Sequence, residues 1–118
     1  MTVKEAGKHT LRFRAVNRDI FDAIKNGKKK IETRAATERY RKIRIGDTII
    51  LVCGKNKINK RVRGKRVFKS FPSLMKKYRP DQINPAIKTE EELLKTYYSF
   101  PKYKEKIKRF WIIALSLK

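Results

Sequence analysis

The excess of positive charge is the feature that most constrains how this chain can fold. Its 118 residues include 33 lysines and arginines but only 11 aspartates and glutamates, so the formal net charge is +22. A compact structure must keep most of these cations at its surface, where their mutual repulsion opposes folding. A bound polyanion relieves that repulsion directly, so nucleic acid is the partner that we expect first.

The lysines and arginines are clustered along the sequence. We predict nucleic-acid contacts from one set of them, namely Lys28, Lys30, Arg39, Arg41, Lys42, Arg44, Lys55, Lys57, Lys60, Arg61, Arg63 and Arg109. Two alternatives to nucleic acid stay open. One is a lysine-rich proteome in which the cations only cover a solvated surface, although such surfaces usually balance lysine with glutamate. The second is acidic lipid, although no strongly amphipathic basic helix stands alone.

The apolar content is sufficient for one hydrophobic core without cross-links. Apolar residues make up 40% of the chain, and a chain of this size hides roughly two-thirds of its unfolded surface on folding. Cys53 is the only cysteine and His9 the only histidine. We therefore expect no internal disulfide, no metal site and no cofactor. A single histidine also argues against Ser-His-Asp and Cys-His hydrolases.

Nothing in the sequence indicates a membrane segment or a signal peptide. No apolar run approaches the ~20 residues that span a bilayer, and Glu5 stands where a signal peptide would be apolar. We expect a cytoplasmic protein that makes no contact with a membrane and is a monomer. Residues 1–8 are predicted to be a flexible lead, and residues 9–118 a single domain.

The first half of the chain alternates between strand and helix patterns. Apolar residues alternate with arginines over residues 10–16, which predicts a strand. A helix follows, with Asn17 as its N-cap and Asn26-Gly27 at its end. Further strands are predicted over residues 30–34 and 48–53.

In the second half, residues 54–59 are predicted to form a hairpin loop and residues 60–69 a strand, in which Gly64 marks a bulge. The remaining predicted elements are a helix from Pro72 to Tyr78, a connection over residues 80–88, a helix that Thr89 caps and Pro101 closes, and a last strand over residues 110–117. About five strands and three helices in this order predict an α+β fold built on a small barrel.

The densest chemical signal is the segment Gly27–Arg34. If it ends in a strand, Lys30, Glu32 and Arg34 project from one face and Lys29 lies at the mouth beside the helix end. A glutamate between two cations holds them in place to bind a phosphate or a carbonyl oxygen. We therefore take Lys29, Glu32 and Arg34 as candidate catalytic residues. A plain salt bridge at the rim of the barrel accounts for the same spacing.

This segment matches, in order, the G-x-K-x-x-E-x-R pattern of the ASCH family, and the chain resembles that family over roughly residues 9–117. The supporting features are the helix over residues 20–24, the turn at residues 43–47, the Ser70-Phe71 step into a helix, and residues 98–101 before the last strand. ASCH domains share the PUA-like fold. The resemblance therefore implies a PUA-like β-barrel of about five strands with about three flanking helices.

The resemblance also implies a function, which is binding of RNA or nucleotides in a cleft beside the motif, with RNA favoured over DNA. Some members are ribonucleases, and others are amidohydrolases that remove the acyl group from N4-acetylcytidine with a lysine, a threonine and a distant glutamate. Lys29 matches that lysine, but Glu32 stands in the threonine's place, and no glutamate over residues 81–92 matches the third member. A carboxylate flanked by cations is a poor nucleophile, which lowers the expectation of this hydrolysis.

Two further functional hypotheses stay open. In a ribonuclease, Lys29 would stabilise charge on the phosphate, and Glu32 or Tyr40 would move the proton of a 2′-hydroxyl. In an accessory protein without a pocket, the lysines and arginines over residues 55–66 would bind ribosomal RNA or an acidic protein.

Aromatic residues near the C-terminus provide a possible stacking surface. Arg109 can contact a phosphate while Phe110 or Trp111 stacks on a base. The alternative is that Trp111 belongs to the core of the last strand. Tyr97 and Tyr98 are adjacent on a helix and cannot both face inward, so we expect one of them to be exposed.

Overall fold

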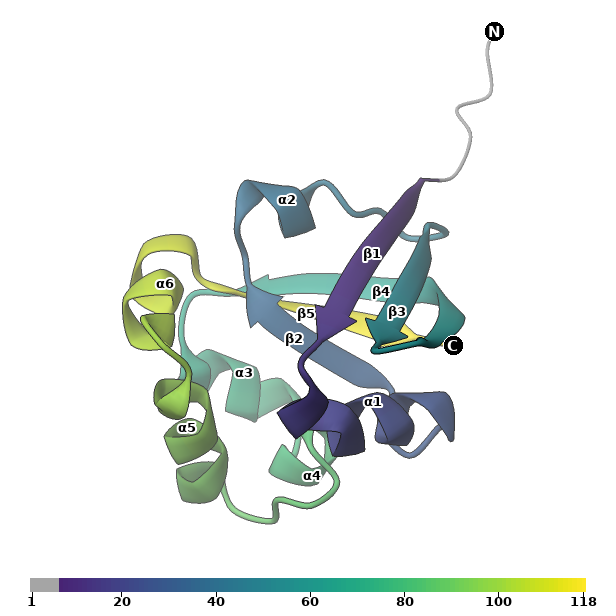
Figure 1. Ribbon diagram of the computed structural model, residues 1–118. Coiled ribbons are helices and arrows are strands. Elements are labelled where there is room, and N and C mark those ends of the chain that lie inside the picture. Colours follow the sequence, from purple (N-terminus) through teal and green to yellow (C-terminus); the bar gives the residue numbers. More distant parts are fainter. Residues whose placement is uncertain (1–6) are drawn as a thin grey trace, which may run out of the picture.

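The computed structural model describes residues 7–118, in which a five-stranded mixed sheet curls into a half-barrel (Figure 1). The strands are β1 (Lys8–Phe13), β2 (Ile31–Ala35), β3 (Thr48–Cys53), β4 (Asn56–Phe68) and β5 (Ile112–Leu117), in the spatial order β1-β3-β4-β5-β2. The β1–β3 pair is parallel and the remaining three pairs are antiparallel. The predicted α+β class with five strands is confirmed. The sheet stays a half-barrel because β1 and β2 are its two free edges.

The long strand β4 joins the two halves of the sheet. It pairs with β3 up to Arg61 and with β5 from Val62 onward, and its register shifts between Val62 and Gly64. The bulge predicted at Gly64 is therefore confirmed. The hairpin loop predicted over residues 54–59 is wrong, because Cys53 already pairs with Asn56 and only a two-residue turn remains. A two-residue turn needs left-handed backbone, which Gly54 supplies with a φ of 59°.

The predicted helices are present, together with three more. They are α1 (Arg18–Lys25), α2 (Glu38–Arg41), α3 (Phe71–Lys77), α4 (Pro80–Ile83), α5 (Glu90–Ser99) and α6 (Tyr103–Phe110), with a short 3-10 turn at Ala15–Asn17. Ser70 and Thr89 cap α3 and α5 by accepting hydrogen bonds from Ser73 and Glu92. The sequence pattern does not predict α2, α4 or α6. In α6, Tyr103 and Ile107 face the protein, but the surrounding lysines obscure that spacing in the sequence.

Two boundaries near the N-terminus also differ from the prediction. The first strand ends at Phe13 rather than at residue 16, because the 3-10 turn begins at Ala15. Residues 1–6 of the predicted flexible lead lie outside the described residues, while Lys8 already belongs to β1. No helix over residues 7–118 is long and apolar enough to cross a membrane.

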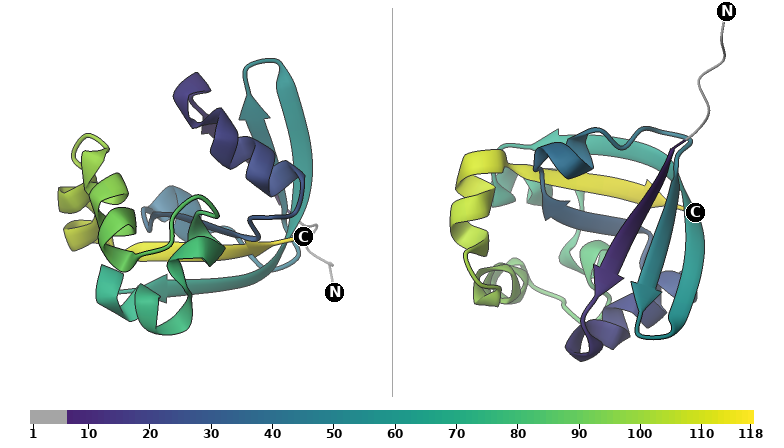
Figure 2. Two further views of the ribbon diagram at one scale, coloured as in Figure 1. Left: turned by 90° about the horizontal axis from the view of Figure 1, so that it is seen from below. Right: turned by 45° about the horizontal axis from the view of Figure 1, so that its top comes forward.

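The last strand separates two hydrophobic cores. Ile113, Leu115 and Leu117 of β5 belong to the core that includes α1, whereas Ile112 and Ala114 belong to the core formed with α3 to α6. A strand covered on both faces needs mostly apolar residues, which explains why every residue of β5 except Ser116 is apolar. Figure 2 shows α1 inside the curl of the sheet and the later helices around the end that carries β2 and β5.

A buried aspartate ties the start of the chain to the turn before β3. Asp47 accepts hydrogen bonds from the backbone N–H groups of Gly7 and Arg44, each at 2.9 Å, and its Oδ2 lies 2.8 Å from Nε2 of His9. Burial acts to raise the pKa of this carboxyl, but the hydrogen bonds from Arg44, His9 and Gly7 outweigh it and lower the pKa to about 2.

We predict that Asp47→Asn lowers the free energy of unfolding by about 1–2 kcal/mol at neutral pH, because charge-assisted hydrogen bonds are lost. The difference in free energy of unfolding between the wild type and the variant should be complete above about pH 3.9, the pKa of an aspartate in the unfolded chain. It should disappear as the pH falls to about 2, the pKa of Asp47 in the folded protein. Urea denaturation of both proteins between pH 7 and 2 measures this. A constant difference across that range would contradict the assignment.

Candidate functional site

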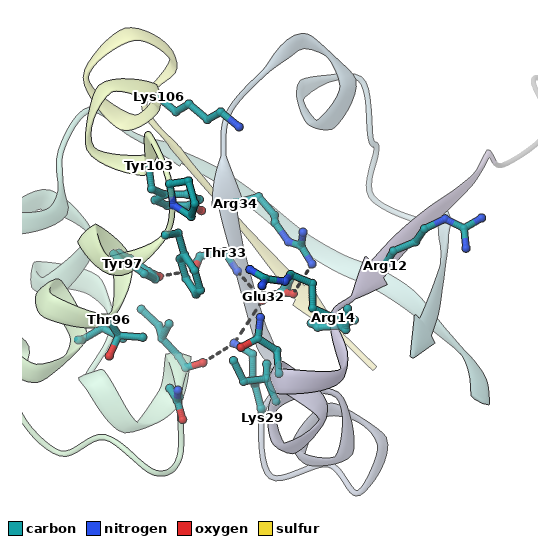
Figure 3. Close-up of a pocket in the computed structure, with 18 residues that line it drawn as sticks. Arg12, Arg14, Lys29, Glu32, Thr33, Arg34, Thr96, Tyr97, Tyr103 and Lys106 are labelled. Carbon is teal, nitrogen blue, oxygen red and sulfur yellow. Dashed lines mark hydrogen bonds and ion pairs between the residues drawn. The ribbon is translucent and has the colours of Figure 1, made fainter. Parts of the chain in front are cut away.

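A cavity of about 360 Å³ opens between the two free edges of the half-barrel, next to α5 and α6 (Figure 3). The end of β1 forms one wall, the helices form the opposite wall, and β2 runs between them. The residues that line it are Arg12, Phe13, Arg14, Asn17, Ile20, Lys29, Glu32, Thr33, Arg34, Ile83, Asn84, Leu93, Thr96, Tyr97, Phe100, Pro101, Tyr103 and Lys106. The cavity therefore exists because the sheet does not close.

The three candidate catalytic residues meet at the base of this cavity. Oε1 of Glu32 lies 3.5 Å from Nζ of Lys29, and its Oε2 lies 3.3 Å from a guanidinium nitrogen of Arg34. The same carboxylate accepts a hydrogen bond of 3.1 Å from the backbone N–H of Thr33. The motif thus places a glutamate between two cations, but Lys30, which the spacing predicts on the same face as Glu32 and Arg34, lines another hollow.

Lys29 lies deeper than the sequence suggests. The pattern predicts it at the mouth, but only 3% of it is exposed, because its ammonium lies between the start of β2 and α4. Its ammonium donates to the carbonyl oxygens of Ile31 and Ile83, in addition to the ion pair with Glu32. Burial lowers the pKa of Lys29, and the Glu32 carboxylate acts in the opposite direction. The amine is therefore fixed in place and releases its proton more easily than an exposed lysine.

Arg34 is the more accessible cation of the trio, with 23% of its side chain exposed. Its guanidinium lies 5.1 Å from the ring centre of Phe13 and 6.0 Å from that of Tyr40. These cation–π contacts and the ion pair with Glu32 hold the group in one orientation at the cavity. Arg34 can therefore offer N–H donors to a ligand without first having to be ordered.

The helical wall is aromatic and carries neutral hydroxyl groups. Tyr97 forms a hydrogen bond with the hydroxyl of Thr33, and the Tyr97 ring packs against Phe71 and Tyr103. Burial raises the pKa of Tyr97 and that of Tyr103, so both phenols stay protonated at neutral pH. Thr33 points to the opposite side of β2 from Glu32 and Arg34, so the cavity wraps around the free edge of this strand.

Positive charge surrounds the cavity. Arg12, Arg14 and Lys106 are exposed lining residues, and Glu32 is the only acidic lining residue among residues 7–118, where Lys29 and Arg34 already neutralise it. None of these three exposed cations is among the predicted site residues. Arg12 and Arg14 alternate with apolar residues, and this alternation by itself indicates only a strand. Lys106 comes from the unpredicted helix α6.

The predicted nucleic-acid residues do not share one face. Lys28, Lys30, Lys60 and Arg63 surround a second hollow, while Arg39 and Lys42 line a small third one beside His9. Arg41 is held by backbone carbonyls, to which it donates hydrogen bonds at Ala36 and Phe110. Lys55, Lys57, Arg44, Arg61 and Arg109 are exposed and line none of these three hollows.

The aromatic residues near the C-terminus are partly exposed. Trp111 is 37% exposed, so it is not a core residue of β5. Its ring lies 5.5 Å from the Arg41 guanidinium and 5.3 Å from the Lys69 ammonium. Arg109 packs over the ring of Phe110 at 5.0 Å. Tyr97 is buried and Tyr98 is 42% exposed, which confirms the prediction that only one of the two faces inward.

Fold and site together define an α+β half-barrel with a basic, aromatic-walled cavity at its open edge. Two solved structures resemble it over nearly their whole length. The crystal structure of hypothetical protein PH0355 is 30% identical, with a TM-score of 0.79 over 94% of this chain and 97% of that one. The solution NMR structure of PF0455 from Pyrococcus furiosus is also 30% identical, with a TM-score of 0.72, and the match covers 97% of this chain and 96% of PF0455.

The chain belongs to the same family as PH0355 and PF0455. No family model matches the chain, and no curated protein does. The likeness supports the half-barrel fold and assigns no activity, because PH0355 is described only as a hypothetical protein.

We predict that Glu32→Gln lowers the free energy of unfolding by about 3–5 kcal/mol, because it leaves the buried Lys29 ammonium without its counter-charge. The double variant Lys29→Met/Glu32→Gln should lose less free energy of unfolding than Lys29→Met and Glu32→Gln lose together, because it leaves no unpaired buried charge between these two positions. Urea denaturation measures both. Additive losses would show that the two side chains are not coupled.

Proposed function

We propose that the protein binds RNA by taking one unstacked nucleotide into the cavity between β1 and β2. The observation that carries this proposal is the combination, in one cavity, of an aromatic wall and a rim of exposed cations. The cavity volume of about 360 Å³ is within the range of small-ligand sites. A base that is already unstacked enters such a site at little cost, and loops and ends of RNA supply such bases.

The aromatic wall provides the surface on which a base would stack. Phe13, Phe100 and Tyr103 are lining residues that are only partly buried, and each packs with its other side against a hydrophobic core. Stacking of one base on such a ring contributes ~1–3 kcal/mol and tolerates any base. Asn17, Asn84 and Thr96 also line the cavity and carry the donors and acceptors that read base edges.

The cationic rim provides the phosphate contacts. Arg12 and Arg14 end the β1 wall, and Lys106 stands on the helical side. Because the Glu32 carboxylate is neutralised within the protein, the charge that faces an incoming phosphate is positive. Arginine binds phosphate oxygens through two parallel N–H groups, which suits Arg12 and Arg14 for this role.

We expect the double variant Arg12→Ala/Arg14→Ala to bind a mononucleotide or a short RNA at least about tenfold more weakly than the wild type. The slope of log affinity against log salt should become shallower by about 1.4, since each lost phosphate contact on a single strand accounts for about 0.7. Isothermal titration or fluorescence anisotropy at several salt concentrations measures both quantities.

The matched control is Lys76→Ala/Lys77→Ala, which removes the same charge from exposed positions on α3 outside the cavity. It should leave mononucleotide affinity within about twofold of the wild type, since its charges are exposed and screened. Equal losses in the two double variants would contradict a site in the cavity and would indicate attraction by net charge alone.

A second candidate function rests on Lys29. Its lowered pKa and its place beside Glu32 and Thr33 at the base of the cavity suit a general base, and the ASCH resemblance implies a catalytic lysine at this position. In an amidohydrolase, the neutral Lys29 amine would take a proton from a water molecule that attacks the acyl carbonyl of N4-acetylcytidine. The proton would then pass to the leaving N4 atom, which releases cytidine and acetate. The ribonuclease hypothesis lacks such support, because both oxygens of Glu32 are engaged and Tyr40, the other proton carrier considered, lines the third hollow and not the cavity.

If this second function holds, the wild-type protein will release cytidine from N4-acetylcytidine, and Lys29→Met will be slower by about 100-fold or more, as expected for loss of a general base. The wild-type rate should rise with pH and level off below the ordinary lysine pKa, because the Lys29 pKa is lowered. Chromatography of the products measures the rate, and circular dichroism verifies folding. Unchanged turnover in Lys29→Met, or none in the wild type, excludes this activity.

A further inference from the structure

A second concave surface lies at the end of the half-barrel where β2 begins and β5 ends. We name it the basic groove and define it by Lys28, Lys30, Lys60, Arg63 and Lys118. Its volume is about 600 Å³, and Gln82 of α4 and Ser116 of β5 also line it. Lys29 lines both the groove and the cavity, so the segment around Lys29 separates the two.

The cations of the basic groove have no acidic side chain as a partner. Over residues 7–118 no aspartate or glutamate lines the groove, and none of its five defining side chains forms an ion pair or donates a hydrogen bond. Lys29, directly beside them, has three acceptors within the protein. Five uncompensated positive charges around one hollow repel each other, and a bound anion would remove that repulsion.

The fold brings these residues together from β4, from the segment just before β2 and from the residue after β5. The backbone N–H of Leu117 donates to the carbonyl of Lys30, and Lys118 exchanges two backbone hydrogen bonds with Arg61. Arg63 is the extra residue of the β4 bulge, because Val62 pairs with Leu117 and Gly64 with Ser116. A bulge turns the side chain of its extra residue out of the regular alternation, which is a common device next to binding sites.

The groove fits a phosphate backbone better than a membrane surface. None of the large exposed apolar side chains of the described chain lines it, so it offers nothing to insert into lipid. It does offer neutral donors beside the cations. Oε1 of Gln82 accepts a hydrogen bond from the backbone of Arg79, which leaves the amide NH₂ group of Gln82 for an anion, and Ser116 contributes a hydroxyl.

We propose that the basic groove binds the phosphate backbone of the same RNA strand that places one nucleotide in the cavity. The strand would pass the segment around Lys29, with the cavity holding a base and the groove holding several neighbouring phosphates. The RNA identity of the strand rests on the proposed function, whereas the binding of a polyanion by the groove does not. The protein then has two sites of different chemistry on one strand.

The test compares two triple variants of equal charge. The first, Lys30→Gln/Lys60→Gln/Arg63→Gln, removes charge from the groove, and the second, Lys76→Gln/Lys77→Gln/Lys95→Gln, removes it from exposed positions on α3 and α5 that line neither hollow. The ligands are a mononucleotide and a single-stranded RNA of about ten nucleotides, a length within the usual range of site sizes. Glutamine keeps much of the aliphatic stem, and thermal melting verifies that each variant is folded.

We expect the groove variant to lose about tenfold or more in affinity for the longer RNA, with a salt slope shallower by about 2, since three phosphate contacts at about 0.7 each are lost. Its affinity for the mononucleotide should equal that of the wild type. The control variant should change neither value by more than about twofold. If the groove variant fails to fold, Lys30→Gln/Lys60→Gln leaves the bulge intact, and the expected change in slope is then about 1.4.

Three results would overturn the proposal. Equal losses in the two triple variants would mean that net charge alone attracts RNA. If the groove variant lost affinity for the mononucleotide as well as for the longer RNA, the groove would not be a separate site. Loss of binding to vesicles of anionic lipid, with RNA affinity unchanged, would assign the groove to a membrane. Failure of the proposed function looks different, because the mononucleotide then does not bind at all while the groove variant still weakens the longer RNA.

Discussion

The buried carboxylate of Glu32 is the interaction on which the site depends. It holds one cation from the turn after α1 and another from β2, and it does so where both the carboxylate and Lys29 are shielded from water. Removing either partner leaves an uncompensated charge in a poorly solvated place, which costs far more than a surface ion pair contributes. Lys29 in turn donates to the carbonyl of Ile83, so the same network also fixes α4 beside the free edge of β2.

The division of charge between the two hollows follows from this network. In the cavity, the cations close to the carboxylate are neutralised, and only the rim stays positive. In the basic groove no aspartate or glutamate of the described chain is present, so its lining cations stay uncompensated by acidic side chains. The first surface suits a ligand with an aromatic part and a phosphate, and the second suits phosphates alone. Such a division lets affinity come from the backbone while the base decides which nucleotide is held.

Much of the fold could be predicted from local patterns in the sequence. Alternation marks β1, basic residues interspersed with Val62 and Val67 mark the second half of β4, capping residues mark the start of α3 and α5, and Gly64 marks the bulge. The start of β4 was missed because Asn56 to Asn59 look like a loop, although their pairing with β3 makes them a strand. Helix α6 was missed because lysines surround the two residues that pack inward, and tertiary packing rather than local propensity stabilises it.

The site was predictable only in part, for a physical reason. Lys29, Glu32 and Arg34 are close in sequence, so strand geometry alone brings them together. Arg12, Thr33, Tyr97 and Lys106 come from separate elements, and only the failure of β1 and β2 to pair places them around one cavity. The burial of Lys29 also could not be predicted from the sequence pattern. The buried ammonium needs the carbonyl oxygens of Ile31 and Ile83 as acceptors, and Ile83 lies in α4, which the pattern does not predict.

The two free edges of the sheet affect how readily the protein aggregates. Open strand edges can add strands from a second copy, which is the usual first step toward aggregation. With a net charge of +22 each molecule repels its neighbours, which opposes such pairing at the two edges that lack a strand partner over residues 7–118. A long nucleic acid that neutralises many molecules at once would remove this repulsion. Crowded complexes should therefore come out of solution more readily than the free protein, and most readily at the ratio where the charges balance.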